Sequence, residues 1–351
     1  MHIGVLTGGG DCPGLNAVIR AVTLALHRDG VRVTGIERGF LGLVDRLVRP
    51  LDDAAVRGIL AEGGTILGTH NRCDPFHHFG AGGADVSDQV MAYVAELGLD
   101  ALVAIGGDGT MAIADGFVRK GLPVVGVPKT IDNDIAHNER SFGFDSAVAV
   151  VAEALDRLAT TARSHGRVMI AETMGRYAGW IALEGGLAGG ADLILIPEQP
   201  FDIEAVAARC REREAGRGWT LVCIAEGAHA AGQGMTVRAR LADSPDPVRL
   251  GGVGQWLQHE LAQRLDSEVR TTLLGHVQRG GTPTAYDRVL ATRFGIAAAQ
   301  LVREGHFGRM VALQDGRCTS VPIGDVAGIN RTVPADDELL RAAAALGVLA
   351  G

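Results

Sequence analysis

Short runs of Val, Ile, Leu and Ala alternate along this chain with longer segments in which apolar residues recur at helical spacing. The apolar runs predict strands at residues 2–7, 32–37, 101–107, 123–128, 167–172, 192–198, 219–227 and 271–277. The amphipathic segments predict helices at residues 15–30, 86–98, 109–121, 147–162, 202–216, 253–266 and 291–305. Continuous apolar strands that alternate with helices are typical of βαβ units and of parallel sheets buried on both faces. The sequence therefore predicts an α/β fold with doubly wound lobes.

Length and composition narrow the class of protein further. The 351 residues exceed what one small domain holds, and they predict two lobes. The net charge of −8 argues against nucleic acid as the main partner. The five scattered cysteines fit a reduced, cytoplasmic protein, and no apolar run is long enough to predict a membrane span.

Three polar, glycine-rich segments follow three of the predicted strands, where open α/β sheets bind their ligands. The first is "GGGDCPG" at residues 8–14. Its glycines allow backbone N–H groups to approach a phosphate, and the next helix offers its N-terminus. The spacing fits neither the dinucleotide fingerprint nor the P-loop. A plain corner between strand and helix remains an alternative.

The second segment, "GGDGT" at residues 106–110, adds a carboxylate at Asp108. An Asp beside phosphates favours Mg²⁺ as the bridging cation. The same string occurs in more than one kinase family, including NAD kinases and lipid kinases.

The third segment, "PKTIDND" at residues 128–134, places a hydroxyl and two carboxylates at alternate positions. In extended chain, Thr130, Asp132 and Asp134 would share one face, as a general base and its supporting groups require. An Asp-rich turn that caps a helix is the alternative, most strongly for Asp134.

Together with "GHVQRGG" at residues 275–281, these strings resemble the 6-phosphofructokinase family over residues 3 to about 315. The similarity is to the mixed-substrate group of actinobacteria-like sequences. The resemblance implies two Rossmann-like lobes with the active site in the cleft between them. It places a donor lobe at residues 1–142 plus 278–327 and a fructose-6-phosphate lobe at residues 143–277 plus 328–351. It also implies phosphoryl transfer from ATP to the 1-hydroxyl of fructose 6-phosphate, a glycolytic reaction.

The family's roles carry over to matching positions. The donor site would comprise Gly10, Arg72, Cys73, Gly106, Gly107, Asp108, Gly109 and Thr110. The only metal ligand implied is Asp108, for Mg²⁺. The catalytic residues would be Asp132 as general base, with Thr130, Arg72 and Arg176 on the transferring group.

The sugar-phosphate site carries over in the same way. It would comprise Thr130, Asp132, Asp134, Arg167, Met174, Gly175, Arg176, Glu226, Arg270, His276 and Arg279. In the family, the residues matching Arg167 and Arg270 reach in from a neighbouring subunit, which implies a homodimer or homotetramer.

Two positions give opposite indications of the phosphoryl donor. In the family, Gly at position 109 accompanies ATP, whereas Lys at position 129 accompanies pyrophosphate. We weigh Gly109 more heavily, because an Asp there would block the α-phosphate. A pyrophosphate-dependent enzyme is the runner-up. A third alternative, an NAD kinase, would leave the "TIDND" and "GHVQRGG" strings unexplained. A fourth, a catalytically silent nucleotide sensor, would not need Asp132, Asp108 and Arg72.

Two further segments depart from the rest. In the regulated bacterial enzymes of the family, a cluster of basic residues forms an effector site between subunits. The matching positions here hold Arg20 but also Leu24, Asp53 and Ala215, which disfavours control by nucleotide or phosphoenolpyruvate. The Gly- and Pro-rich stretch at residues 227–252 predicts a surface excursion.

Overall fold

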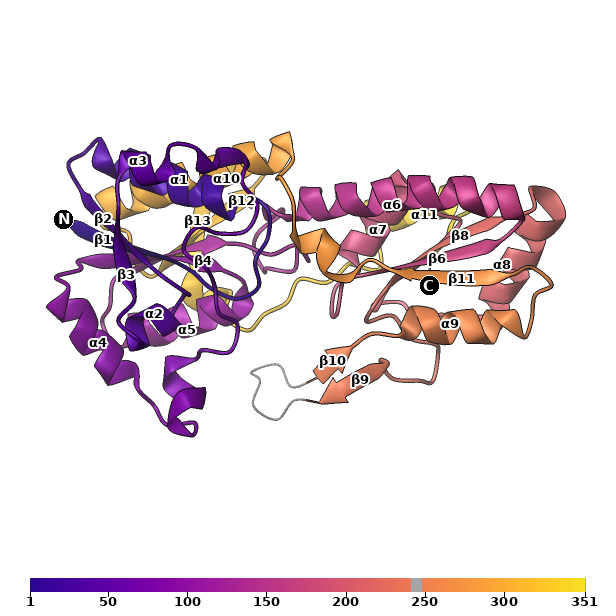
Figure 1. Cartoon of the computed structure of the whole chain (residues 1–351), viewed down its shortest axis with the longest axis horizontal. Coiled ribbons are helices and arrows are strands. Elements are labelled where there is room, and N and C mark those ends of the chain that lie inside the picture. Colours follow the sequence, from indigo (N-terminus) through magenta and orange to yellow (C-terminus); the bar gives the residue numbers. More distant parts are fainter. Residues whose placement is uncertain (241–247, 351) are drawn as a thin grey trace. The chain divides into compact units, whose positions relative to one another are not determined.

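The computed structural model describes residues 1–240 and 248–350, in which helices and strands alternate along the chain (Figure 1). The chain forms two compact units. The first unit comprises Met1–Ile131, Ile135–Ser146 and Arg279–Asn330. The second comprises Asp132–Asp134, Ala147–Gln278 and Arg331–Gly351. Residues 132–134 therefore group with the second unit, although the sequence analysis placed them in the donor lobe.

The first unit is built on a sheet whose order, within the described residues, is β13-β12-β5-β4-β1-β2-β3. The strands are β1 (His2–Thr7), β2 (Arg32–Ile36), β3 (Val48–Leu51), β4 (Ala101–Gly106), β5 (Val124–Pro128), β12 (Arg309–Gln314) and β13 (Arg317–Pro322). Neighbouring strands from β12 to β2 pair in parallel, and only the edge strands β3 and β13 pair antiparallel. The predicted mainly parallel sheet is confirmed.

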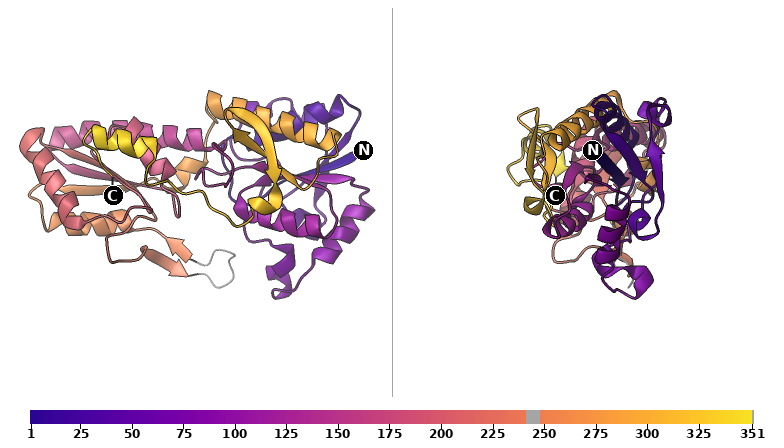
Figure 2. Two further views of the ribbon diagram at one scale, coloured as in Figure 1. Left: turned by 180° about the vertical axis from the view of Figure 1, so that it is seen from behind. Right: turned by 90° about the vertical axis from the view of Figure 1, so that its left-hand side faces the viewer.

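Helices cover both faces of this sheet (Figures 1 and 2). On one face lie α1 (Leu15–His27), α3 (Asp53–Val56) and α10 (Ala285–Arg303). On the other lie α2 (Leu41–Val44), α4 (Ser87–Glu96) and α5 (Asp108–Arg119). Helices α1 and α10 approach so closely that a Cβ on Gly295 would lie 2.6 Å from the Cβ of Ala21. The two-sided cover explains why the central strands are apolar throughout.

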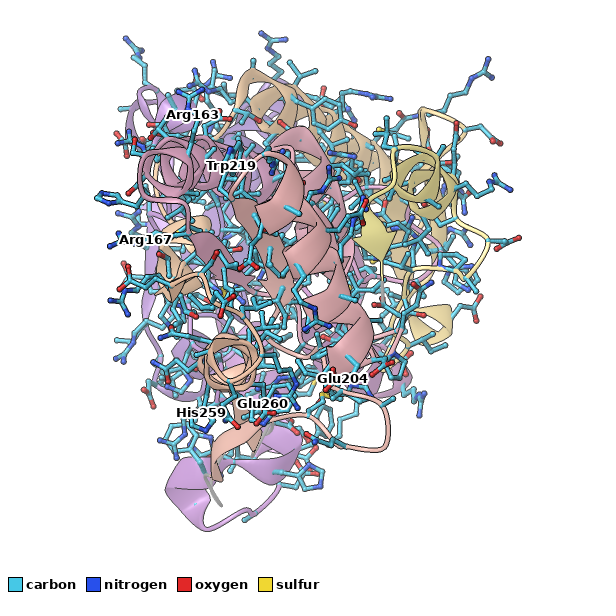
Figure 3. The ribbon with its side chains drawn as sticks, turned by 90° about the vertical axis from the view of Figure 1, so that its right-hand side faces the viewer. Arg163, Arg167, Glu204, Trp219, His259 and Glu260 are labelled. Atoms are coloured by element: carbon cyan, nitrogen blue, oxygen red, sulfur yellow. The ribbon has the colours of Figure 1, made fainter. Side chains whose placement is uncertain are left out.

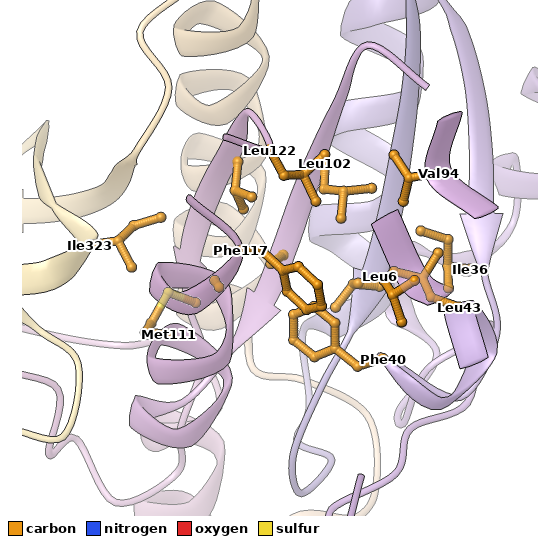
Figure 4. Packing of buried hydrophobic residues seen from close by; sticks show 14 of the residues in the cluster. Leu6, Ile36, Phe40, Leu43, Val94, Leu102, Met111, Phe117, Leu122 and Ile323 are labelled. Atoms are coloured by element: carbon orange, nitrogen blue, oxygen red, sulfur yellow. The ribbon is translucent and has the colours of Figure 1, made fainter. Parts of the chain in front are cut away.

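A buried core fixes α5 against the sheet of the first unit (Figure 4). Leu6 of β1 and Leu102 of β4 pack with Met111 and Phe117 of α5. The rings of Phe117 and Phe40 stack with their centroids 5.6 Å apart. Burial of each such side chain contributes roughly 1.5–3 kcal/mol. This packing holds the N-terminus of α5 at the carboxyl edge of the sheet, where the candidate site lies.

The second unit holds a sheet with the order β11-β6-β8-β7-β14 in the described residues. Its strands are β6 (Val168–Thr173), β7 (Leu193–Leu195), β8 (Thr220–Ala225), β11 (Val269–Leu273) and β14 (Leu349–Ala350), and all pair in parallel. Helices α6 (Phe144–His165), α7 (Trp180–Ala188) and α11 (Glu338–Ala345) cover one face. Helices α8 (Ile203–Gly216) and α9 (Val253–Ala262) cover the other. The fold class predicted from the sequence is thus confirmed in both units.

The predicted excursion at residues 227–252 carries an antiparallel hairpin of β9 (Val237–Arg240) and β10 (Val248–Leu250). Residues 241–247 of this excursion lie outside the described residues. Among the described helices, none is both long and apolar enough to cross a membrane.

Candidate active site

Three loops of the first unit meet at the carboxyl edge of its sheet, because β1, β4 and β5 are parallel neighbours. The backbone N–H of Gly8 donates to the carbonyl oxygen of Ile105 at 2.8 Å, and that of Lys129 donates to Gly106 at 2.9 Å. The strands lie about 4.8 Å apart. The first two motifs and the start of the third, at Lys129, are therefore brought together in one place.

Thr110 explains why two of these loops need glycine. A Cβ on Gly8 would lie 2.6 Å from the Thr110 hydroxyl oxygen, and a Cβ on Gly106 would lie 2.3 Å from it. Side chains of real residues do not approach this closely. Thr110 is only 5% exposed and fills the space between the two loops, so its first role is to pack them together.

Two cations hold the backbone of the first loop. Lys129 is only 3% exposed, and its ammonium group donates a hydrogen bond to the carbonyl oxygen of Gly10. The Arg279 guanidinium donates to the carbonyl oxygen of Asp11 at 3.2 Å. A Cβ on Gly10 would lie 2.8 Å from the same guanidinium. Arg279, predicted to bind the sugar phosphate, thus contacts the predicted donor loop within the first unit.

Two helices begin at this edge with N-termini that no described side chain caps. Helix α1 follows Gly14, whose φ of 102° lies in the left-handed region that favours glycine. Helix α5 begins at Asp108, with Gly107 as the N-cap residue. Uncapped N–H groups and the helix dipole attract anions such as phosphate.

Asp108 is half-buried beside these N–H groups. The described residues contain no group of three or more His, Cys, Asp or Glu that could hold a metal alone. Magnesium is often held by one or two carboxylates together with substrate phosphates. A single Asp at the uncapped N-terminus of α5 fits that pattern.

The loop that carries Arg72 is tied to the first loop by Thr69, which the sequence analysis did not single out. The Thr69 hydroxyl donates to the carbonyl oxygen of Gly9 at 2.5 Å. The Arg72 guanidinium lies 5.2 Å from the centroid of the Phe79 ring. Cys73, the next residue, is 5% exposed and belongs to the hydrophobic core, and burial raises its pKa to about 12. Any contact between Cys73 and a donor would therefore use its backbone.

In the second unit, the predicted sugar-phosphate loops meet at the carboxyl ends of β6, β8 and β11. The Glu226 N–H donates to Thr173 at 2.9 Å, and the Gly227 N–H donates to Gly175 at 3.1 Å. A Cβ on Gly227 would lie 1.9 Å from the carbonyl oxygen of Arg176. Met174, Gly175, Arg176 and Glu226 are thus neighbours.

Gln278 connects this group to the loop that carries His276. Its side-chain oxygen accepts from the Met174 N–H at 3.3 Å, and its side-chain nitrogen donates to the carbonyl oxygen of Gly275 at 3.0 Å. Gln278 is fully buried, whereas His276 is exposed. The sequence analysis missed Gln278, although it lies within the "GHVQRGG" string.

The segment predicted to present Thr130, Asp132 and Asp134 on one face does not run as an extended strand. Asn133 has a φ of 54°, which turns the chain between the two carboxylates. The argument from strict alternation is therefore wrong for this segment. Asp132 and Asp134 are half-buried and belong to the second unit, and Thr130 belongs to the first. The next helix begins only at Phe144, so Asp134 does not cap it.

Arg167 and Arg270 lie at the opposite edge of the second sheet, where β6 and β11 begin. Figure 3 shows Arg167 at this edge. Both guanidinium groups form ion pairs with the carboxylate of Glu268. The six residues of β6 separate Arg167 from Met174, a span of roughly 20 Å in a strand. Within one unit, these two arginines are therefore not brought to the loops of Met174 and Glu226.

Parallel sheets with glycine-rich loops and open helix N-termini at their carboxyl edges define the class of α/β proteins built to bind phosphate groups. The phosphofructokinase family model matches residues 2–302, and the chain belongs to that family.

The relatives include enzymes named for either donor. The chain is 50% identical over 339 residues to ATP-dependent 6-phosphofructokinase 2 of Streptomyces coelicolor, covering 96% of this chain and 97% of that protein. It is 49% identical over 335 residues to the pyrophosphate–fructose 6-phosphate 1-phosphotransferase of the same organism, covering 95% and 96%.

Solved structures agree on the fold. Phosphofructokinase of Pichia pastoris in the T-state matches with a TM-score of 0.80 and 33% identity over 93% of this chain. The chain spans 35% of the length of that Pichia chain. The pyrophosphate-dependent phosphofructokinase of Nitrosospira multiformis matches with a TM-score of 0.84 at 19% identity, covering 99% of this chain and 92% of that one.

Proposed function

We propose that this chain is a 6-phosphofructokinase that transfers the γ-phosphoryl group of ATP to the 1-hydroxyl of fructose 6-phosphate. Family membership supports the reaction class. The observation that carries the proposal is the meeting of two uncapped helix N-termini, of α1 and α5, with Asp108 at one sheet edge. This arrangement suits a bound polyphosphate and its cation.

ATP is preferred as the donor because of the space around Gly109. No atom lies within 4 Å of a Cβ built at Gly109, which is exposed on the first turn of α5. A nucleotide needs room there for its α-phosphate. Relatives named for ATP and for pyrophosphate are about equally similar, so overall identity does not choose between the donors.

Asp108 would hold Mg²⁺ together with the donor phosphates. When bound, the ion would neutralise the charge that builds up on the transferring group. The Arg72 guanidinium, on the loop that Thr69 joins to Gly9, would supply further positive charge. The Thr130 hydroxyl and Arg176 complete the predicted set around the transferring group.

Asp132 would act as the general base that takes the proton of the sugar 1-hydroxyl. A half-buried carboxylate on a turn is suited to this task if its position is fixed. Glu226 would accept hydrogen bonds from sugar hydroxyls, and Asp134, Met174 and Gly175 would line the same site. His276 and Arg279 would bind the 6-phosphate with charge-assisted hydrogen bonds.

The remaining two sugar-phosphate ligands would come from a second copy of the chain. Arg167 and Arg270 lie at the sheet edge opposite to Glu226, and a neighbouring subunit can present that edge to the site. We therefore propose that the active form is at least a homodimer. All five cysteines lie within the described residues and are free, which favours a reducing, cytoplasmic environment.

A pyrophosphate-dependent enzyme is the second candidate, favoured by the buried cation of Lys129 beside the donor loop. The experiment is to incubate the purified protein with fructose 6-phosphate, Mg²⁺ and either ATP or pyrophosphate, and to identify products by phosphorus NMR. Fructose 1,6-bisphosphate and ADP are expected. The Asp132→Asn variant should lose about 10²–10⁴ in kcat. A variant that retains the parental kcat within a few-fold would remove Asp132 from the role of base.

A further inference from the structure

Residues 132–134 form a short segment between two buried isoleucines. Ile131 and Ile135 are 0% and 1% exposed and belong to the first unit, whereas the three residues between them belong to the second. Asn133 has a φ of 54°, a left-handed conformation that asparagine adopts more readily than most other non-glycine residues. Something must hold this turn in place if Asp132 is to keep a fixed position.

Arg331 donates hydrogen bonds to two carbonyl oxygens of this segment. Its backbone N–H donates to Asp134 at 2.7 Å, and its guanidinium donates to the carbonyl oxygen of Asn133 at 3.1 Å. Just before Arg331, Asn330 forms an antiparallel bridge with Ile135. The chain at 330–331 thus runs alongside residues 133–135 and bonds to the backbone on the C-terminal side of Asp132.

The Arg331 side chain is itself fixed by Trp180. The guanidinium carbon lies 4.1 Å from the centroid of the indole ring, and the indole N–H donates to the carbonyl oxygen of Arg331 at 3.2 Å. Trp180 is 3% exposed and begins α7. A cation stacked on a buried Trp contributes about 1–2 kcal/mol. Stacking also orients the planar guanidinium toward Asn133.

The carboxylate of Glu198 joins the segment at residues 331–333, which we call the strap, to the second sheet. Glu198 accepts hydrogen bonds from the backbone N–H of Val333 at 2.8 Å and from that of Gly179 at 2.9 Å. Gly179 precedes Trp180, and Glu198 follows β7. The strap at residues 331–333 is therefore joined to the carboxyl edge of the second sheet, where Met174 and Glu226 also lie.

We propose that Arg331 is a positioning residue for the reaction: it holds the backbone turn at Asn133 and thereby fixes Asp132 for proton removal. The inference rests on the proposed function, since it assigns Arg331 to the base of that reaction. Arg331 needs no contact with either substrate for this role. A misplacement of about 1 Å can cost on the order of 10²-fold in rate.

The test compares Arg331→Met and Arg331→Lys with the parent. Methionine keeps the backbone bond to Asp134 and an unbranched, uncharged side chain but removes the donor to Asn133. Lysine keeps a cation that can still donate to Asn133 but lacks the planar stack on Trp180. Arg341→Met is the matched control, because Arg341 is exposed on α11 of the same unit.

Two measurements are made on each protein. Steady-state kinetics with ATP and fructose 6-phosphate give kcat and both KM values. Amide hydrogen exchange, followed by mass spectrometry, reports the protection of residues 130–136. For Arg331→Met we expect kcat to fall roughly 10–100-fold, both KM values to stay within about threefold, and exchange in this segment to accelerate at least about tenfold. Arg331→Lys should recover part of the kcat, and Arg341→Met should match the parent.

The outcomes separate the inference from the function beneath it. A parent that does not phosphorylate fructose 6-phosphate overturns the proposed function, and the exchange data then still decide whether Arg331 holds the segment. An active parent with an Arg331→Met kcat within about twofold overturns the inference. So does a loss of kcat with unchanged exchange at residues 130–136. If Arg331→Met does not fold, Arg331→Lys takes its place: a lower kcat together with faster exchange at residues 130–136 supports the inference, and a parental kcat or unchanged exchange overturns it.

Discussion

The ammonium group of Lys129 donates a hydrogen bond to the backbone carbonyl oxygen of Gly10. Lys129 follows β5 and is almost fully buried, and Gly10 lies in the loop after β1. The cation is thus engaged with the backbone of the loop that we propose binds the phosphoryl donor. On the proposed function, this contact is compatible with ATP as donor, and we propose Gly109 as the position that discriminates between donors.

Replacing Gly109 with Asp should reduce the use of ATP without harming the fold. The new Cβ meets no atom within 4 Å, and an acidic residue in the first turn of α5 is favourable for the helix. A carboxylate about 4 Å from the α-phosphate costs roughly 4 kcal/mol at an effective dielectric constant near 20, before screening by the metal. We expect kcat/KM for ATP to fall at least about tenfold, or about 1.4 kcal/mol.

Gly109→Ala is the control for this variant, because it adds the Cβ without the charge. It should retain the parental kcat/KM within about threefold. A Gly109→Asp protein that uses ATP as well as the alanine variant would show that this position does not set the donor.

Gln278 offers a test of the sugar-phosphate site. Gln278→Leu would leave the Met174 N–H and the Gly275 carbonyl oxygen without their buried partner. Each lost partner costs about 1–3 kcal/mol. We expect KM for fructose 6-phosphate to rise at least about fivefold, with KM for ATP nearly unchanged. Gln300→Leu, at an exposed position of α10, is the matched control. Equal changes in both KM values would contradict the assignment.

The parallel sheets and the glycine-rich loop after β1 could be predicted from the sequence because their signals are local. A run such as residues 101–107 is apolar throughout only if both faces are covered, and glycines at a strand end indicate close backbone approach. The start of α10 was placed six residues late. Thr284 caps the helix by accepting from the Asp287 N–H at 3.2 Å, and this short polar signal precedes the apolar period.

The supports of the candidate site could not be predicted in the same way. Arg331 is 198 positions from Asn133 in sequence, and the contact between them depends on packing of distant elements. Asparagine adopts a positive φ more often than most residues, so Asn133 carries a local signal for the turn that the alternation argument did not use. For this reason alternation predicted a shared face for the carboxylates, and the structure has a turn instead.

Mixing two inactive variants tests whether sites are completed by a second subunit. Arg270→Ala removes one ligand of the sugar phosphate, and Asp132→Asn removes the base. If Arg270 acts in a neighbouring subunit, hybrid oligomers contain some sites with both groups intact. We expect each variant alone to have below about 10% of parental activity and the reassembled mixture to recover about a quarter. A fully active protein with the mass of one chain would rule out this arrangement.

The buried carboxylate of Asp287 predicts a dependence of stability on pH. Asp287 is fully buried at the start of α10 and accepts hydrogen bonds from the backbone and hydroxyl of Ser146 at 2.8 and 2.6 Å. Burial raises its pKa from 3.8 to about 6. Because the folded pKa exceeds the unfolded one, this group's stabilising contribution is complete below pH 4 and is lost as the pH rises toward 6.

The corresponding loss of unfolding free energy is on the order of 3 kcal/mol. Asp287→Asn cannot ionise but keeps an oxygen that can accept from Ser146. In the parent, the unfolding free energy measured by urea titration should fall as the pH rises from 4 to 7. In Asp287→Asn, the part of this fall that comes from Asp287 should be absent. A parallel pH dependence in both proteins would contradict a raised pKa at Asp287.

The most direct test of the central claim is the ratio of kcat/KM for ATP to kcat/KM for pyrophosphate, measured on the parent with fructose 6-phosphate and Mg²⁺. The open space at Gly109 predicts a ratio well above one, at least about tenfold in favour of ATP. A ratio below one would contradict the account, because the cation of Lys129 would then choose the donor and the space at Gly109 would not.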